Sequence, residues 1–175
     1  MRQNEKLIKL VTAALMAALT CTVTMAIPIK IPNSNGGYIH PGDAFVLLSG
    51  ILLGPIYGGL SAGIGSMMAD LLSGYAQYAP ATFIIKLLAA MIGGYSFHHF
   101  RKLPSTVSVI LSGVIGGIIV TLGYLLYDRF LTGNWGSATA GVPFNLLQNL
   151  MAIVLASVLL PLIKKVPQIK DMIEK

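Results

Sequence analysis

Six apolar runs, separated by short stretches of turn-forming residues, occupy most of this sequence. The predicted runs cover residues 7–27, 43–53, 56–73, 81–97, 106–127 and 144–163. A helix needs roughly 20 predominantly apolar residues to cross roughly 30 Å of bilayer hydrocarbon, and every run except the second approaches that length. We therefore expect an all-α integral membrane protein with six transmembrane helices in a single membrane domain, residues 1–175. The short second run is expected to be tilted or only partly embedded.

Charge is too scarce in this chain for a soluble protein. Hydrophobic residues make up 55% of the 175 positions and charged residues only 10%, with a formal net charge of +6. The basic residues flank the apolar runs rather than line one helix face, so we expect no nucleic-acid partner. Cys21 is the single cysteine, which excludes an intrachain disulfide and a cysteine-rich metal site. We expect Cys21 to be a packing residue, and we expect no metal and no cofactor.

The distribution of Lys and Arg predicts the orientation in the membrane. With a cytoplasmic N-terminus, only Lys30 and Arg129 lie in outer loops and Lys86 lies within a span. The inner flanks then hold the remaining basic residues: Arg2, Lys6, Lys9, Arg101, Lys102, Lys164, Lys165, Lys170 and Lys175. Because cytoplasmic flanks carry an excess of Lys and Arg, both termini are predicted to be cytoplasmic. The N-terminal run resembles a signal peptide, but we expect it to be retained as the first span.

Polar residues gather toward the predicted outer side. The outer loops at residues 28–42, 74–80 and 128–143 are long, and the first and last are rich in flexible turn formers that could close over a cavity. Polar groups inside spans are costly and usually face the protein interior. The candidate binding residues near this side are His40, Asp43, Asp70, Tyr75, Tyr78, Lys86, Tyr124, Asn145, Gln148 and Asn149. Few polar groups among apolar walls are typical of a small-molecule pocket.

Each candidate also has a purely structural interpretation. Asp70 and Lys86 fall at similar depth in one hairpin, so they could simply pair with each other, which does not exclude contact with a ligand. Asn145, Gln148 and Asn149 share one helix face at i, i+3 and i+4 spacing, which also suits hydrogen bonds between helices. The tyrosines could equally form an interfacial aromatic belt.

Small residues recur at four-residue spacing in the first run. Ala13 and Ala17 form one such pair, and Ala14 and Ala18 form another. Small faces let helices approach closely, so this run could pack against an external partner helix. No G-x-x-x-x-G-K-[ST] phosphate loop is present in the sequence. If the chain drives uphill transport, the energy must therefore come from a partner or an ion gradient.

The run "GGYIHPGDAFVLLSGILLGPIYGGLSAGIGSMMADLLSGYAQYAPATFIIK", residues 36–86, closely resembles the substrate-binding S components of energy-coupling factor (ECF) vitamin transporters. The nearest branch is that for hydroxymethylpyrimidine, pyridoxine or pantothenate, which is related to the riboflavin type. The resemblance implies a six-helix subunit of the bacterial cell membrane that binds a vitamin in its outer half and is not itself an enzyme. It also implies association with a T component and two cytoplasmic ABC-type ATPases. In that family an A-x-x-x-A pattern on the first helix docks the T component. Here Ala14 and Ala18 match it best, with Ala13 and Ala17 as the offset alternative.

The substrate stays open between several water-soluble vitamins. Pantothenate would need Lys86 as its counter-charge, whereas a pyridine or pyrimidine alcohol would need hydrogen-bond partners such as Asp70, Asn145 and Gln148. If Asp70 neutralises Lys86, the pocket is nearly neutral, which favours pyridoxine or hydroxymethylpyrimidine over pantothenate. A solitary ion-coupled carrier that uses Asp70 and Lys86 as a proton relay is the alternative function. An intramembrane enzyme comes third, because no nucleophile and base pair can be named.

Overall fold

A computed structural model of the chain describes residues 3–30 and 38–174, and helices dominate that part. The helices are α1 (Gln3–Ala26), α2 (Asp43–Leu72), α3 (Ala79–His99), α4 (Ser105–Thr132), α5 (Trp135–Ala140), α6 (Val142–Ile163) and α7 (Pro167–Glu174). Two short strands, β1 (Ile29–Lys30) and β2 (Tyr38–Ile39), pair antiparallel in the first outer loop. The all-α prediction is confirmed, with this two-residue ladder as a small addition.

The described residues contain five helices that are long and apolar enough to cross a membrane, judged by length and composition. The count is lower than the predicted number of spans because the second and third runs both belong to α2. Large apolar side chains cover the outside of the bundle, and Leu126, Phe130 and Val158 are each at least 60% exposed. An aqueous surface would not carry so many of them, whereas the hydrocarbon of a bilayer accommodates them.

The α2 helix folds back on itself at Gly54. This residue has φ 77° and ψ 178°, a backbone conformation that is essentially restricted to glycine, and Pro55 follows it. A Cβ atom on Gly58 would clash with the backbone oxygen of Ser49, so the two parts of α2 lie against each other. The first part, residues 43–53, is about 16 Å long at 1.5 Å per residue, too short to cross the hydrocarbon. It is therefore the short helix that the sequence predicted.

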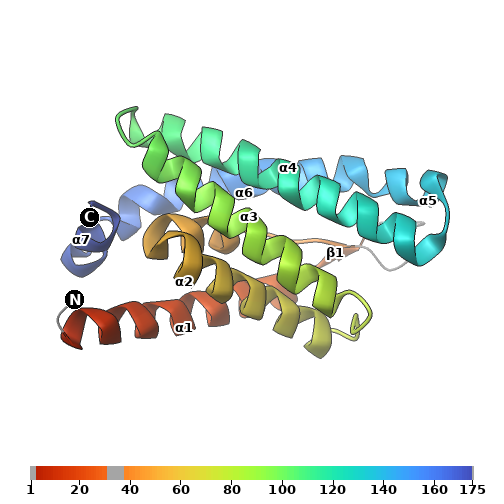
Figure 1. Cartoon of the computed structure of the whole chain (residues 1–175), viewed down its shortest axis with the longest axis horizontal. Helices are drawn as coiled ribbons and strands as arrows, with labels where there is room; N and C mark the ends of the chain where they lie inside the picture. Colours follow the sequence, from red (N-terminus) through yellow and green to blue (C-terminus); the bar gives the residue numbers. More distant parts are fainter. Residues whose placement is uncertain (1–2, 31–37, 175) are drawn as a thin grey trace.

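The helices form one bundle whose two ends differ (Figure 1). The start of α1, the bend of α2 and α7 lie at one end, whereas α5 and the connection between α2 and α3 lie at the other. We call these the inner and outer ends, following the orientation predicted from the basic flanks. Along the bundle α1 packs on α2, α2 on α3, α3 on α4, and α4 and α2 on α6.

Two regions differ from the sequence-based expectation. The last outer loop, predicted as flexible over residues 128–143, is largely helical because α4 continues to Thr132 and α5 follows. Gly133, with φ 67°, ends α4, and the side chain of Asn134 caps α5 by accepting a hydrogen bond of 2.7 Å from the Gly136 N–H. At the inner end α7 was not predicted. It packs on α2, and its Ile173 is 6% exposed.

Candidate ligand-binding site

A buried ion pair lies at the outer start of α2. Lys86 Nζ on α3 donates to both carboxylate oxygens of Asp43, at 2.6 and 2.7 Å, and the two residues are only 1% and 4% exposed. The predicted pairing of Lys86 with Asp70 is therefore wrong. Both aspartates lie near the outer end, but Asp43 is the first residue of the short arm of α2, which packs deeply into the bundle. The long Lys86 side chain reaches it there.

Gln148 and His40 extend this pair into a network. Gln148 Nε2 on α6 donates to Asp43 Oδ2 at 2.8 Å, and Gln148 Oε1 accepts the backbone N–H of His40 at 3.0 Å. A second hydrogen bond, of 3.2 Å, joins His40 Nδ1 to Thr24 Oγ1 on α1. All four residues are buried, with at most 7% of any of them exposed. Burial lowers the pKa of His40 to about 4, so its ring is neutral at physiological pH.

Tyr124 approaches the same lysine from α4. Lys86 Nζ lies 5.3 Å from the centroid of the Tyr124 ring, within the range of a cation–π interaction. The Tyr124 hydroxyl shares a 2.9 Å hydrogen bond with Thr82 Oγ1, which fixes the ring. The structure thus brings together five predicted site residues: His40, Asp43, Lys86, Tyr124 and Gln148.

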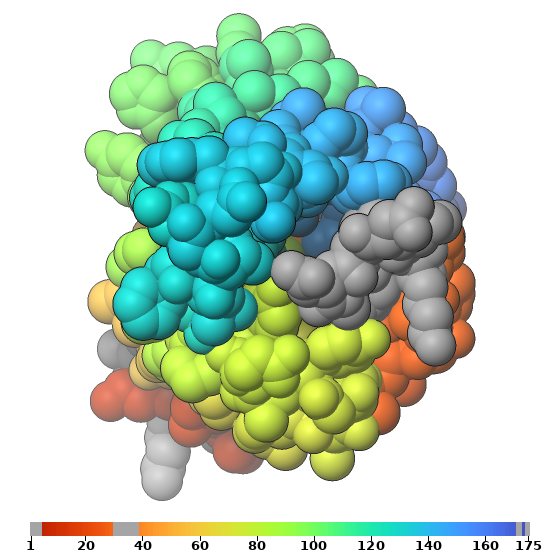
Figure 2. Space-filling view, turned by 90° about the vertical axis from the view of Figure 1, so that its right-hand side faces the viewer, coloured from red at the N-terminus to blue at the C-terminus, as the bar shows by residue number. Residues whose placement is uncertain are grey.

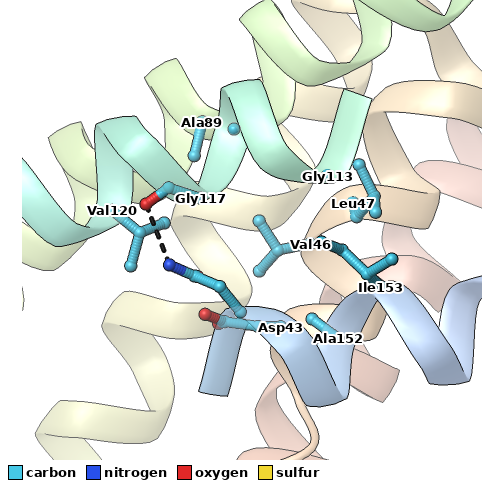
Figure 3. A pocket seen from close by; sticks show the side chains of 11 residues that line it. Asp43, Val46, Leu47, Ala89, Gly113, Gly117, Val120, Ala152 and Ile153 are labelled. Carbon is cyan, nitrogen blue, oxygen red and sulfur yellow. Dashed lines mark hydrogen bonds between the residues drawn. The ribbon is translucent and has the colours of Figure 1, made fainter. Parts of the chain in front are cut away.

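A small cavity lies inward of the ion pair, between α2, α3, α4 and α6 (Figure 3). About 300 Å³ of empty space lies between its lining residues, a figure that includes space open to the outside, and only a small part of it is wide enough for water. Its walls are almost entirely apolar or glycine, and Asp43 and Asn149 supply the polar side chains. The lining residues are Asp43, Val46, Leu47, Ala89, Gly113, Gly116, Gly117, Val120, Asn149, Ala152 and Ile153.

Asn149 is held in place by α4. Its Nδ2 donates to the backbone oxygen of Gly117 at 2.9 Å, the dashed line in Figure 3, and to Thr121 Oγ1 at 3.0 Å. Gln148 and Asn149 therefore do make the hydrogen bonds between elements that were one of their two predicted interpretations. Their contact with a ligand remains a prediction.

The outer end of the molecule is hollowed above this region. Figure 2 views that end and shows a depression between the α4–α5 corner, the connection of α2 to α3, and α6. The first outer loop also belongs to this end, but the predicted gating role of that loop falls largely on residues 31–37, outside the described residues.

Of the predicted site residues only Asp43 and Asn149 line the cavity, and His40, Lys86, Tyr124 and Gln148 belong to the network beside it. The other four, Asp70, Tyr75, Tyr78 and Asn145, are not in the lining. Asp70 is 7% exposed, and its backbone oxygen accepts a 2.8 Å hydrogen bond from the Tyr75 N–H in the following turn. The Tyr78 hydroxyl donates to Asp128 Oδ1 at 2.9 Å, which ties this turn to α4. Burial and the neighbouring Asp128 raise the pKa of Tyr78 above its ordinary value. These contacts brace the outer end, and ligand contact by the four residues remains a prediction.

The two alanine pairs of α1 face different surroundings. The backbone oxygen of Ala13 accepts a 2.7 Å hydrogen bond from Ser61 Oγ, and a Cβ on Gly65 would clash with the backbone oxygen of Ala17. Ala13 and Ala17 thus pack against α2, whereas Ala14 and Ala18 are exposed.

Thr24 and the α4 glycines were not among the predicted site residues. The "GVIGG" stretch at residues 113–117 could have been found as a small-residue face, like those of the other runs. Nothing in the sequence marks Thr24, because its partner is distant in the chain. Among the described residues no cluster of three or more His, Cys, Asp or Glu could hold a metal ion.

Comparisons with known proteins agree with this architecture. Residues 4–165 match the family described as the ECF-type riboflavin transporter, S component. The chain is 36% identical over 149 residues to an uncharacterized protein in the gap 3' region of Pyrococcus woesei, covering 85% of this chain and 95% of that protein. It is 28% identical over 162 residues to the thiamine precursor transporter HmpT of Lactococcus lactis subsp. cremoris (strain MG1363), covering 93% and 91%.

A solved structure shares the fold. The structure titled "Structure and mechanism of the S component of a bacterial ECF transporter" aligns with a TM-score of 0.67 and 20% identity. The alignment covers 89% of this chain and 95% of that one, so it includes the helices around the cavity.

Proposed function

The chain belongs to the ECF-type riboflavin transporter S component family, and from this premise we propose that it binds a single-ring vitamin precursor in the cavity beside Asp43. It is an integral membrane transport subunit, not an enzyme. In the proposed cycle a T component and two ABC-type ATPases deliver the bound molecule to the cytoplasm. Partner ATPases would supply the energy, since the sequence carries no phosphate loop of its own.

The apolar cavity is the observation that carries the proposal. Ligand pockets are mostly apolar, with a few placed polar groups that fix orientation. Here Asp43 and Asn149 are the polar side chains, and Asn149 Oδ1 remains as an acceptor because its Nδ2 makes both of the side chain's hydrogen bonds. The cavity is narrow and lined by glycine and alanine on three helices. This geometry suits a flat, single heteroaromatic ring better than the three fused rings of a flavin.

We favour a hydroxymethylpyrimidine-type ligand, with pyridoxine next. Asp43 neutralises Lys86, so the site is nearly neutral and offers a carboxylate ligand such as pantothenate no unpaired lysine at this position. An aminopyrimidine instead supplies N–H donors for Asp43 or Asn149. The 28% identity to a thiamine precursor transporter supports the same class.

Calorimetry on the purified chain tests the substrate. We expect 4-amino-5-hydroxymethyl-2-methylpyrimidine to bind more tightly than pyridoxine, and pantothenate and riboflavin to bind weakly. Asn149→Leu is expected to weaken the pyrimidine by about tenfold or more, the loss of a buried hydrogen bond to the ligand. Ser96→Ala is the control, because Ser96 lies near the inner end of α3, donates to the backbone oxygen of Ile92 and does not line the cavity. Absence of binding by all four compounds would contradict the proposal.

The solitary ion-coupled carrier is less well supported, because the proton relay named for it requires Asp70 next to Lys86. Lys86 contacts Asp43 instead. Uptake of the pyrimidine by vesicles that contain this chain alone, without ATP, would restore that alternative.

A further inference from the structure

We propose that Gln148 and His40 are positioning residues that transmit the occupancy of the cavity to helix α1. This proposal rests on the cavity being the ligand site. Its physical basis is a continuous buried chain of hydrogen bonds, Asp43–Gln148–His40–Thr24, that begins at the cavity and ends on α1.

The first step concerns how α1 is attached. It packs along α2 and has no comparable contact with α3, α4 or α6 within the described residues. Only 17% of its membrane-spanning window is buried, against 67% for α2. Because α1 is held on one side only, a specific contact with another part of the bundle can determine its position.

The second step is that His40 supplies such a contact at the outer end of α1. Its ring bonds Thr24 on α1, and its backbone N–H is held by Gln148 on α6. Thr24 and His40 are closely packed here, because a Cβ on the neighbouring Gly42 would clash with Thr24 Oγ1 and lie 2.8 Å from His40 Nδ1. A movement of Gln148 therefore displaces His40, and with it the Thr24 end of α1.

The third step links Gln148 to the cavity. Its amide nitrogen donates to Asp43 Oδ2, and Asp43 lines the cavity. Oδ2 already accepts from both Lys86 and Gln148, so a ligand donor that engages this oxygen competes with the Gln148 hydrogen bond. The amide must then move or rotate, and its other end holds the His40 N–H. Occupied and empty cavities therefore differ in the restraint on α1.

The consequence concerns the exposed pair on α1. Ala14 and Ala18 lie on the same helix as Thr24. The position of α1 relative to the bundle, which the Thr24 contact restrains, therefore affects how a partner binds to these two alanines. Coupling of this kind is reciprocal: a partner that fixes α1 must also alter ligand affinity.

A double-mutant cycle tests the relay without any ligand. The readout is the rate at which maleimide labels Cys21, a partly exposed thiol one turn from Thr24 on α1. We expect Thr24→Val and Gln148→Leu each to change this rate, and the double variant to deviate from additivity by more than about twofold, as residues of one network do. Asn149→Leu is the matched control, because Asn149 forms its hydrogen bonds with α4 rather than with His40. Its effect on the labelling rate should therefore add to that of Thr24→Val. Additive behaviour of Thr24 and Gln148 would overturn the relay.

A ligand arm separates the relay from the proposed function. Saturating 4-amino-5-hydroxymethyl-2-methylpyrimidine should change Cys21 labelling in the native chain and in Thr22→Val, an exposed control position on α1. In Thr24→Val the change should disappear while calorimetry shows the same affinity within about threefold, since Thr24 does not line the cavity. A native chain that binds the pyrimidine without a labelling change overturns the relay. A native chain that does not bind it contradicts the proposed substrate, and the ligand-free cycle still decides the relay.

Discussion

Lys86 Nζ lies 2.6 Å from Asp43 Oδ1, and the pair connects α3 to the outer start of α2 with almost no exposure to solvent. Desolvating two charges is expensive, and their attraction repays that cost only when both are well hydrogen-bonded. Here Gln148 adds a further donor to Asp43, and the Tyr124 ring lies beside the ammonium group. The pair therefore fixes the wall of the cavity in one geometry.

Removing one partner of this pair should strongly destabilise the chain. Lys86→Met or Asp43→Asn alone leaves a buried charge or a buried polar group without its partner, and we expect a loss of about 3–5 kcal/mol. The double variant should recover much of that loss. Thermal unfolding in detergent measures the effect, with Asp70→Asn as the control because Asp70 is not the partner of Lys86. Equal losses of stability for Asp43→Asn and Asp70→Asn, or no recovery of stability in the double variant, would contradict the pairing of Lys86 with Asp43.

The sequence predicted the helices, the outer location of the polar residues and the separate short segment at residues 43–53. It could not predict the partner of Lys86. Spacing within one helix fixes which residues share a face, but contacts between helices depend on how the helices rotate and tilt. Asp43 and Asp70 both lay at a suitable depth. The deciding fact is that Gly54 folds α2 back, which brings its short arm into the bundle centre.

Helix α7 illustrates a different failure. The terminal stretch "VPQIKDMIEK" is predicted only as part of an inner flank, yet its apolar residues repeat at helical spacing. Ile169 and Ile173 fall on one face, and both pack against the core cluster that contains Leu52 and Leu53. Eight residues are too few for a reliable helix signal without tertiary contacts.

His40 should make stability depend on pH. Burial lowers its pKa from 6.5 to about 4, with Asp43 opposing and Lys86 reinforcing the shift. The unfolded chain takes up a proton near pH 6.5, whereas the folded chain does so only near pH 4. This contribution to stability is therefore intact above pH 6.5 and is lost as the pH falls toward 4, by at most about 1.4 kcal/mol per pH unit. Thermal unfolding between pH 7.5 and 4.5 should show a shallower slope for His40→Asn. Identical slopes would exclude the titration of His40.

Gly54 should be sensitive to any side chain although the space around it is open. Its φ of 77° with ψ of 178° is strained for other residues, and a Cβ there meets no atom within 4 Å. Gly54→Ala should therefore cost about 1–3 kcal/mol through backbone strain alone. Gly93→Ala is the control, because Gly93 lies within the helix α3 and its Cβ would meet Leu47 Cδ1 at 3.3 Å. Denaturant or thermal unfolding measures both, and a neutral Gly54→Ala variant would argue against the fold-back of α2.

The two alanine pairs on α1 should separate folding from partner binding. Ala14 and Ala18 are exposed, so leucines at both positions should leave thermal stability unchanged within about 0.5 kcal/mol, as at an ordinary surface site. The same two leucine substitutions should abolish co-purification with the T component and the two ATPases, because bulky side chains prevent close helix approach. Leucines at Ala13 and Ala17 should instead destabilise the chain itself, since Ser61 and Gly65 of α2 lie against their backbone. Retention of the complete complex by the Ala14→Leu, Ala18→Leu variant would place the partner on another surface, and unfolding of that variant would show that this face of α1 is not exposed.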